Sequence, residues 1–224
     1  MLKSKLISSL PDKFPGYYSF LNHSSSIYLS KGDYSHELIT GYYVDGSILL
    51  WYLKYFKGMK NLERKSFDNA NLAPLVFERF RDRQFAFIGG SEGDIQLFKV
   101  NFERNYPEIK AVFSDGYRDT SEYLKIISNL TEECVLVVGL GAPKQELFLC
   151  ELAKHNFHCL AFTCGAYITQ SAHRWDYYHV NEGLDRFRVI WRVLQEPAKI
   201  LKRLTLDIFR FLFKTRFIFS NDKH

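Results

Sequence analysis

The stretch Val135-Leu-Val-Val-Gly-Leu-Gly-Ala-Pro-Lys-Gln-Glu146 passes from a strand pattern through a turn to a helix pattern. Its first four residues are apolar and mostly β-branched, which is typical of a strand buried on both faces. The chain then turns through Gly139 and Gly141, passes Pro143 and enters a helical pattern at 145–154. A buried strand, a glycine turn and a helix form the repeating unit of α/β folds, so this stretch predicts such a fold.

The same turn is a candidate site for an anion. A glycine turn before a helix points backbone N–H groups and the positive end of the helix dipole at a guest, usually a phosphate. A Gly-x-Gly turn alone is more often free of ligand. Here Lys144, Gln145 and Glu146 add polar side chains at the sheet edge where open α/β folds bind ligands. The dinucleotide fingerprint is incomplete, because position 144 holds lysine where a third glycine is due.

Strands and helices alternate along the chain before this stretch and after it. We expect strands at 17–21, 41–44, 84–88, 109–113, 135–138 and 158–163. We expect helices at 24–31, 48–56, 72–80, up to about 105, at 121–130 and at 145–154. Ser24 is the expected cap of the first helix. This alternation predicts a mostly parallel, Rossmann-like sheet with helices on both faces.

In a parallel sheet, the carboxyl ends of all strands meet along one edge. Polar residues and glycines follow the predicted strands there: Asn22, Asp45, Gly89, Gly90, Asp115, Gly116, Gly139, Gly141 and Gly165. The sequence therefore predicts one cleft that collects these positions.

Length and composition restrict the class of protein. A chain of 224 residues is one domain, or one domain with an appendage, and 46% apolar residues suffice for a core. The net charge of +5 fits an anionic ligand or an anionic membrane surface. Four cysteines lie in or beside apolar runs without zinc spacing, so we expect core thiols in a reducing compartment. We see no signal peptide and no apolar run of roughly 20 residues, and we expect a cytoplasmic protein.

The chain changes character near Val180. Residues 180–224 read as a basic helical appendage to a core formed by 1–179, and six Lys or Arg lie between 199 and 216 beside many phenylalanines. Such a segment suits an anionic membrane surface; the alternative is a helix that packs on the core or on a second copy. Loss of vesicle binding on removal of residues from about 200 onward distinguishes the two. The apolar helix at 48–56 packs either in the core or at an interface between copies of the chain, so the sequence does not decide whether the protein is a homo-oligomer.

Several of these residues have both a chemical and a structural interpretation. Asp45 is either a general base for a substrate hydroxyl or the N-cap of the next helix. Asn22 either bonds a sugar or closes its turn, and Arg64 either pairs with a phosphate or is solvated. Gly89-Gly90 either admits a base or diphosphate or forms a plain turn. The histidines show no metal spacing and no Asp-x-Asp occurs, so a leaving diphosphate would rely on cations and helix N-termini.

Taken together, these residues resemble the WecG/TagA/CpsF glycosyltransferases, glycosyltransferase family twenty-six. The motifs that carry the resemblance are Tyr43-Val-Asp-Gly46, Arg64-x-Ser-x-Asp68, Phe87-Ile-Gly-Gly90, Tyr106-Pro107, Val138-Gly-Leu-Gly-Ala-Pro-Lys-Gln-Glu146 and Trp191-Arg-Val-Leu-Gln-Glu-Pro197. Two positions depart from the family pattern. Phe20 stands where the family often has threonine, and Ser171-Ala-His173 stands where it often has Arg-Ala-Pro.

The resemblance implies a metal-independent inverting enzyme without a cofactor. Such an enzyme moves a sugar, of the N-acetylmannosamine type or a related hexose, from a UDP donor to an undecaprenyl-diphosphate-linked acceptor. The acceptor lies at the inner face of the cell membrane, the appendage binds that membrane, and the product feeds surface polysaccharides; no nucleic acid is expected as a partner. The implied catalytic residues are Asp45 as base, Arg64 and Gln145. The implied substrate-binding residues are Asn22, Ser66, Gly89, Gly90, Gly139, Gly141, Lys144, Glu146 and Arg192.

Two other functions stay open at this point. The two departures from the family pattern motivate a catalytically silent UDP-sugar-binding protein at the membrane, which would bind the donor without turnover. A nucleotide-dependent oxidoreductase on a Rossmann sheet is the other, and the incomplete glycine fingerprint counts against it.

Overall fold

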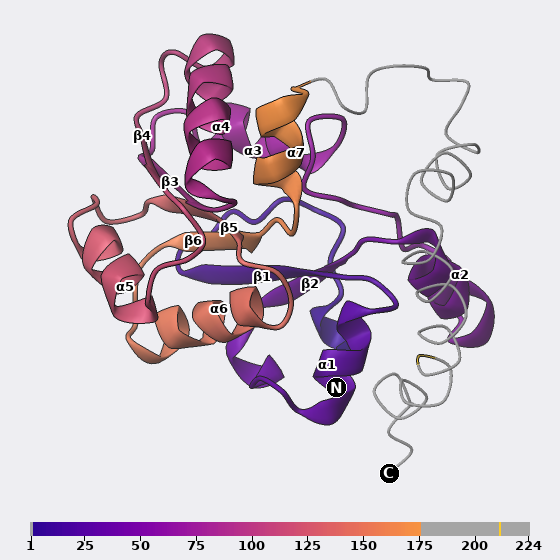
Figure 1. Cartoon of the computed structure of the whole chain (residues 1–224). Coiled ribbons are helices and arrows are strands. Elements are labelled where there is room, and N and C mark those ends of the chain that lie inside the picture. The colour runs from indigo at the N-terminus through magenta and orange to yellow at the C-terminus, as the bar shows by residue number, and fades with distance from the viewer. Residues whose placement is uncertain (1, 176–210, 212–224) are drawn as a thin grey trace.

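The computed structural model describes residues 2–175 and Phe211. The six strands are β1 (Gly16–Leu21), β2 (Gly41–Val44), β3 (Phe85–Gly89), β4 (Ala111–Ser114), β5 (Val135–Gly139) and β6 (Leu160–Thr163). They form one sheet in the order β2-β1-β6-β5-β3-β4, and every neighbouring pair is parallel. The predicted α/β, Rossmann-like sheet is confirmed (Figure 1). The predicted appendage and its boundary lie outside the described residues, apart from Phe211.

The helices within the described residues lie between the strands. They are α1 (Ser25–Lys31), α2 (Ser47–Phe56), α3 (Leu72–Arg79), α4 (Glu92–Asn105), α5 (Thr120–Ser128), α6 (Lys144–Lys154) and α7 (Tyr167–His173). Short 3-10 turns occur at Leu2–Lys5 and His36–Leu38. The sequence pattern predicts neither these turns nor α7, and it starts the fourth and sixth strands two residues too early.

The chain fills the sheet from both sides toward the middle. It builds β1 and β2 on one side, crosses to β3 and β4 on the other, and then returns to insert β5 and β6 between them. The inserted strands have neighbours on both edges, with Gly89 opposite Gly139 and Tyr18 opposite Phe162. Since helices also cover both faces, β5 must be apolar on both, and its first four residues are fully buried.

Two hydrophobic layers sandwich the sheet. Helices α1, α2, α5 and α6 pack on one face, and α3, α4 and α7 pack on the other, as Figure 1 shows. The layer under α3, α4 and α7 is strongly aromatic: Phe77, Phe85, Phe87, Phe98 and Phe102 are all buried there. The rings of Phe87 and Phe102 lie 4.6 Å apart. Such pairs contribute about 0.5–1.5 kcal/mol each beyond their buried area.

The first helix is capped by a residue other than the predicted one. Ser24 occupies the N-cap position of α1, but its side chain makes no cap hydrogen bond. Instead, Oδ1 of Asn22 accepts from the N–H groups of Ser24 and Ser25, each at 2.9 Å. The prediction for Ser24 is therefore wrong. Asn22 takes the role because an Asn side chain readily bonds the backbone two residues ahead.

The four cysteines, Cys134, Cys150, Cys159 and Cys164, are buried and form no disulfide. This confirms their prediction as core thiols. Among the helices of the described residues, none is long and apolar enough to cross a bilayer.

Candidate active site

The carboxyl ends of the strands bring the predicted polar residues and glycines to one edge. From the sheet order, Asp45 after β2 is followed along the edge by Asn22, Gly165, Gly139 and Gly89. Neighbouring strands are about 4.8 Å apart, so this row spans roughly 20 Å. Asp45 thus lies at one end of the row, and the glycine turns occupy its other half.

Asp45 and Arg64 form a pair at the outer end of this edge. The loop before α3 runs beside β2: Arg64 makes an isolated parallel bridge with Val44, and the N–H of Lys65 donates to the Val44 carbonyl at 2.9 Å. This places Nε of Arg64 3.5 Å from Oδ1 of Asp45, with the two side chains 45% and 33% exposed. Gly46 occupies the N-cap position of α2, and Asp45 lies one residue before it. Exposed ion pairs add only about 0–1 kcal/mol of stability, which leaves this pair open to a chemical role.

Asn22 adjoins this pair but serves its own turn. Its Oδ1 caps α1, and its backbone N–H donates to Oγ of Ser25 at 2.9 Å. A Cβ added to Gly46 would lie 3.1 Å from Cβ of Asn22, so the two strand ends are in close contact. Of the two interpretations of Asn22, turn closure is the one that the structure shows.

The glycine turns allow the ends of three strands to pack against each other. Gly89 has φ +151°, and a Cβ there would meet the Gly139 carbonyl oxygen at 2.6 Å. A Cβ at Gly139 would likewise meet the Gly165 carbonyl oxygen at 2.8 Å. Gly90 accepts from the N–H of Gly116 at 2.9 Å. Backbone instead of side chains therefore forms this part of the edge, a surface that a ligand can approach closely.

Gly141 and Lys144 belong to the open part of the β5–α6 turn. Gly141 has φ +76°, and a Cβ there would meet nothing within 4 Å. Lys144 is the first residue of α6 and is exposed. A cation beside a helix N-terminus favours an anionic group, and the anion site at this turn stays a prediction.

Gln145 and Glu146 form the centre of a buried polar network under the edge. Nε2 of Gln145 donates to Oε1 of Glu146 at 2.9 Å, and Oε1 of Gln145 accepts from the Gly165 N–H at 3.3 Å. Oγ of Ser19 also donates to Oε1 of Glu146, and Oγ1 of Thr163 donates to Oγ of Ser19 at 3.2 Å. Gln145 is thereby held on both sides of its amide, between α6 and the end of β6.

The Glu146 carboxyl lies inside the fold. Its Oε2 is buried without a hydrogen-bond partner, in the same layer as the buried hydroxyls of Tyr34 and Tyr42. Burial raises the pKa of Glu146, and the hydrogen bonds from Gln145 and Ser19 only partly oppose this effect. The structure thus gives Glu146 no open surface for a ligand and places it behind Gln145.

The remaining predicted residues have different surroundings. Ser66 is buried, and its Oγ bonds the Asp68 carboxylate, which in turn accepts from the Ala70 N–H at 3.0 Å. The serine and aspartate of this motif thus shape the loop that carries Arg64 to Asp45. Arg192 lies outside the described residues.

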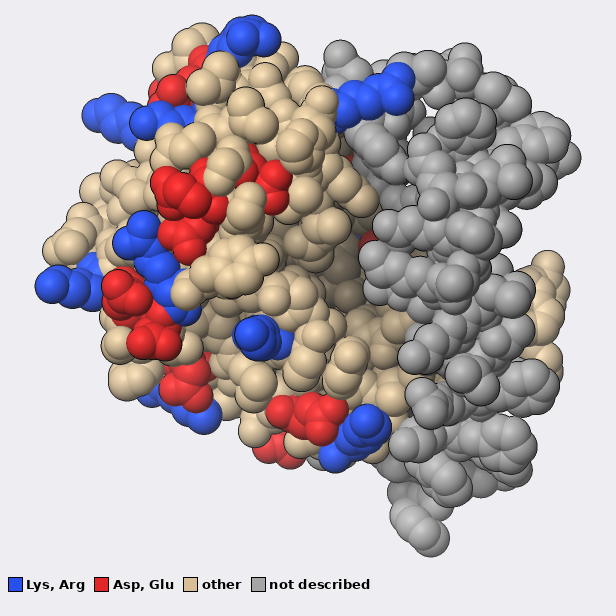
Figure 2. Space-filling model, in the orientation of Figure 1, with Lys and Arg blue, Asp and Glu red and all other residues tan. Residues whose placement is uncertain are grey.

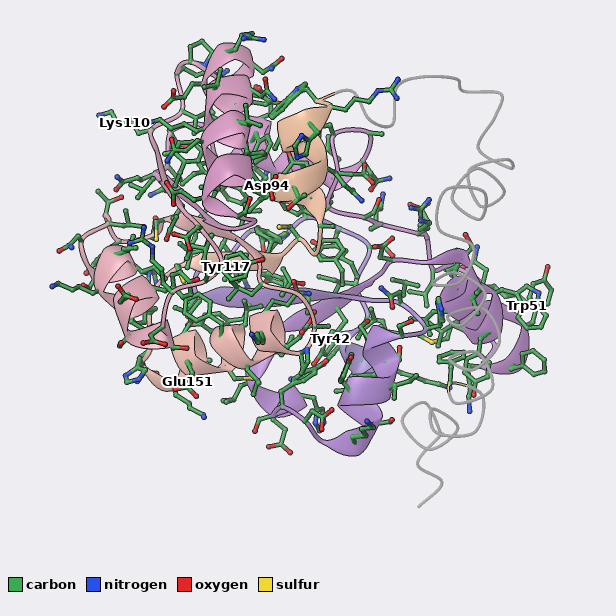
Figure 3. The ribbon with its side chains drawn as sticks, viewed as in Figure 1. Tyr42, Trp51, Asp94, Lys110, Tyr117 and Glu151 are labelled. Atoms are coloured by element: carbon green, nitrogen blue, oxygen red, sulfur yellow. The ribbon has the colours of Figure 1, made fainter. Side chains whose placement is uncertain are left out.

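The loop after β4 holds residues that the sequence pattern does not single out. Tyr117, labelled in Figure 3, is 83% exposed. Its N–H donates to Oδ1 of Asp115 at 3.0 Å. Nε of Arg118 donates to Oδ2 of Asp115 at 2.8 Å, which lowers the pKa of that carboxyl. The loop therefore displays an aromatic ring and a cation beside the Gly90 turn. The sequence signal for Tyr117 is its position directly after Asp115-Gly116 at the end of a strand.

The surface around this edge carries mixed charge. Figure 2 shows acidic and basic side chains interspersed over the described part of this face, which is hollowed near the centre of the view. Among the residues that the structure describes, no group of three or more His, Cys, Asp or Glu side chains is arranged to hold a metal ion.

A separate hollow of about 450 Å³ lies at the opposite, amino edge of the sheet. Its lining includes Phe14, Arg83 and Glu133. The guanidinium of Arg83 pairs with the Glu133 carboxylate at 2.6 Å and lies 5.7 Å from the Phe14 ring centroid. The charges of Arg83 and Glu133 thus stabilise one another, at the edge of the sheet opposite the carboxyl ends of the strands.

Comparison with known proteins identifies the family. The family model described as "Glycosyl transferase WecG/TagA/CpsF family" matches residues 13–222. The chain belongs to the WecG/TagA/CpsF glycosyltransferase family. A relative from Shigella boydii is 30% identical over 188 residues, which cover 80% of this chain and 76% of the relative. That relative is a UDP-Gal:alpha-D-GlcNAc-diphosphoundecaprenol beta-1,4-galactosyltransferase.

The first departure from the WecG/TagA/CpsF pattern lies in the aromatic layer. Phe20 is buried, and its ring stacks on Tyr43 at 4.9 Å and meets Phe67 edge-on at 6.0 Å. Its backbone N–H donates to Oγ1 of Thr163 at 3.2 Å. The threonine position of the family is therefore occupied here by a core residue.

The second departure lies at the end of α7. Nε2 of His173 is 2.9 Å from Oδ1 of Asp94, and Nδ2 of Asn101 donates to the carbonyls of Ser171 and Ala172. In this WecG/TagA/CpsF glycosyltransferase, the segment thus fastens α7 to α4.

Proposed function

We propose that this glycosyltransferase is a metal-independent inverting enzyme. It would transfer a hexose from a UDP-sugar to an undecaprenyl-diphosphate-linked sugar in surface polysaccharide synthesis. The observation that carries the proposal is the Asp45 carboxylate, paired with Arg64 at 3.5 Å at the carboxyl edge of the sheet. The name of the Shigella boydii relative supports a lipid-diphosphate acceptor and makes galactose the first donor to test.

In the proposed mechanism, Asp45 acts as general base. Its carboxylate takes the proton from the acceptor hydroxyl as that oxygen attacks the anomeric carbon from the face opposite UDP. The new glycosidic bond forms as the bond to UDP breaks, and the electron pair leaves with the diphosphate. Arg64, which is partly exposed beside Asp45, would stabilise the charge that develops on the leaving group.

The glycine half of the edge would bind the donor. The turns at Gly89 and Gly139 present backbone, and Lys144 adds a cation at the start of α6. A diphosphate would find N–H groups and positive charge there, while the exposed Tyr117 ring offers a surface for a flat base. Gln145, which is fixed from both sides by the buried network, would orient the sugar between donor and base.

The enzyme would act at the inner face of the cell membrane, where its lipid-linked acceptor resides. The basic segment at 180–224 would hold it there as a peripheral protein, and Arg192 would contribute a cation to the substrate. No cofactor is needed for this transfer, since UDP-sugar is a substrate.

A silent UDP-sugar-binding protein is the second candidate. The observation in its favour is Phe20, which replaces a family hydroxyl with a buried ring. It predicts donor binding without transfer to any lipid acceptor. The oxidoreductase is disfavoured by the lysine at position 144, and NAD(P) binding would be needed to revive it.

Product formation from a panel of UDP-sugars tests the proposal. UDP-galactose, UDP-N-acetylmannosamine and UDP-glucose are offered with a short-chain lipid-diphosphate-linked N-acetylglucosamine, once with EDTA and once with magnesium. We expect transfer that survives EDTA and a product whose anomeric centre is inverted. Dependence on added magnesium or a retained configuration would contradict the mechanism. Donor binding without any product would favour the silent protein.

A further inference from the structure

One face of α2 exposes three large aromatic side chains. Trp51, Tyr55 and Phe56 are 52%, 75% and 62% exposed. The ring centroid of Trp51 lies 5.8 Å from that of Tyr55 and 5.1 Å from that of Phe56, so the three side chains form one continuous patch. We call these three residues the α2 aromatic face. Trp51 projects away from the body of the protein in Figure 3.

The fold does not need this face. Helix α2 packs on the core through the buried side chains of Leu49, Tyr52 and Leu53. The aromatic face lies outside that contact and leaves a large apolar area in water. Monomeric proteins seldom keep contiguous apolar patches exposed, and those that persist usually bind something.

The surroundings of the face are basic. Residues 46–62 contain three lysines, Lys54, Lys57 and Lys60, and no aspartate or glutamate, with Asp45 and Glu63 directly outside this range. Nζ of Lys57 lies 5.7 Å from the ring centroid of Tyr52. Lys3 lies against the end of the helix, where its Nζ donates to the Lys57 carbonyl at 3.5 Å. Aromatic rings that settle at headgroup depth, flanked by lysines, match the chemistry of an anionic bilayer surface.

We propose that the α2 aromatic face docks on an anionic lipid surface, with Trp51, Tyr55 and Phe56 at headgroup depth and the lysines against lipid phosphates. This inference rests on the proposed function, because it explains how the acceptor reaches the site. Helix α2 begins two residues after Asp45 and is about 15 Å long. Docking therefore holds the Asp45 carboxylate within roughly that distance of the membrane surface, where the head of a lipid-linked acceptor resides.

A second copy of the chain fits the face less well. In a twofold dimer the same patch meets itself, so Lys54, Lys57 and Lys60 of both copies would gather at one interface. No acidic residue of 46–62 is present to neutralise them. An anionic surface supplies the opposite charge, which is why we assign the face to lipid.

Fluorescence of Trp51 tests the docking directly in the full-length chain. The chain has three tryptophans, and Trp175→Phe with Trp191→Phe leaves Trp51 as the reporter. Vesicles contain phosphatidylcholine with one third phosphatidylglycerol, with or without bromine on the acyl chains near the headgroup. We expect a blue shift and bromine quenching of Trp51. An unchanged, unquenched spectrum on protein that sediments with the vesicles would overturn the proposal.

Sedimentation with the same vesicles tests the energetics. We expect vesicle binding to weaken at least about tenfold in the triple variant Trp51→Ser, Tyr55→Ser, Phe56→Ser. The matched control is Leu75→Ser with Leu97→Ser, which removes comparably exposed apolar side chains from α3 and α4. This control should bind as wild type. Each lysine near such a surface is expected to change binding about fivefold. Lys54→Gln, Lys57→Gln, Lys60→Gln should therefore weaken binding and reduce its dependence on phosphatidylglycerol. Undiminished binding by the aromatic variant, or its conversion from dimer to monomer by light scattering, would overturn the proposal.

Activity separates this inference from the proposed function. The aromatic variant should keep its rate on a water-soluble, short-chain acceptor and lose at least tenfold on a full-length acceptor in vesicles. Equal rates of variant and wild type in vesicles would contradict the docking and leave the transferase intact. Absence of transfer by wild type to the soluble acceptor would instead contradict the proposed function.

Discussion

Asp45 is the residue on which the proposed chemistry depends. A general base typically contributes about 10²–10⁴-fold to the rate. Asp45→Asn keeps the shape and loses the proton acceptor, so we expect turnover to fall by about that factor while UDP binding, measured by calorimetry, stays near wild type. Asp33→Asn, at an exposed carboxylate beyond α1, is the matched control. Near wild-type turnover in Asp45→Asn would remove Asp45 from the mechanism.

The buried carboxyl of Glu146 gives stability a dependence on pH. Burial raises its pKa in the folded chain above the usual 4.5, so over that interval the folded state holds a proton that the unfolded state has lost. The free energy of unfolding therefore falls as pH rises above about 4.5 and stops falling above the folded pKa.

Glu146→Gln removes this titration and keeps an oxygen for the Ser19 and Gln145 donors. Relative to wild type, the variant should gain stability as pH rises from about 4.5 through the raised pKa of the folded carboxyl, measured by urea denaturation. Parallel pH profiles of the two proteins would show that the carboxyl is not the group responsible.

Residue types alone predict which residues lie at the site better than they predict the contacts around each of them. Asp45 and Arg64 are recognisable as charged residues after a strand and in a loop, and the structure brings them together. Glu146 looks like a surface ligand, because it follows Lys144 at the start of a helix. Its burial depends on a hydroxyl from a strand that is distant in sequence, Ser19, so local pattern cannot predict it.

Among the elements, the β3 turn makes the strictest demand on a single residue. Gly89→Ala places a Cβ 2.6 Å from the Gly139 carbonyl oxygen at a positive φ. Backbone cannot give way as a side chain can, so we expect a loss of about 2 kcal/mol or more in the free energy of unfolding. Gly93→Ala is the control, because Gly93 lies in α4 and a Cβ added there would meet its nearest neighbour, Oγ of Ser91, at 3.9 Å. That change should be neutral or stabilising by up to about 1 kcal/mol. Equal destabilisation of both variants would refute the packing argument.

Strands and helices of this chain differ in how far sequence predicts them. The strands are short apolar runs between turn residues, so their number and order along the chain follow from pattern. Helix α7 escapes prediction, because Tyr167–His173 is short and its apolar positions are few. It is fixed by contacts with α4, including the Asn101 amide bonds to Ser171 and Ala172. Tertiary contacts therefore decide this element.

At the scale of the molecule, Phe211 joins the C-terminal region to the core. Its ring is fully buried and meets Tyr52 of α2 edge-on at 5.1 Å. Phe211→Ala should cost about 3 kcal/mol, as expected for a buried ring replaced by alanine. Phe56→Ala, on the exposed side of the same helix, should cost little in the absence of lipid. Urea denaturation of both variants makes the comparison, and a Phe211→Ala protein as stable as wild type would contradict this anchoring.

The class of fold is predictable from alternation of strands and helices, whereas the order of strands is not. Pattern shows six parallel strands but gives no reason why β5 and β6 lie between β1 and β3. That order is what sets Asp45 and the glycine turns at opposite ends of one edge.

The same strand order fixes a sequence of events during synthesis. Strand β1 has β6 as its inner neighbour, with Gly16 opposite Leu160 and Tyr18 opposite Phe162. Between them lie about 140 residues, which a ribosome takes on the order of 7–30 s to make at 5–20 residues per second. Throughout that interval, β1 and β2 of the nascent chain present an unpaired inner edge, open to chaperones and to neighbouring chains. Strand β6, the last strand within the described residues, is therefore the one that ends this exposure.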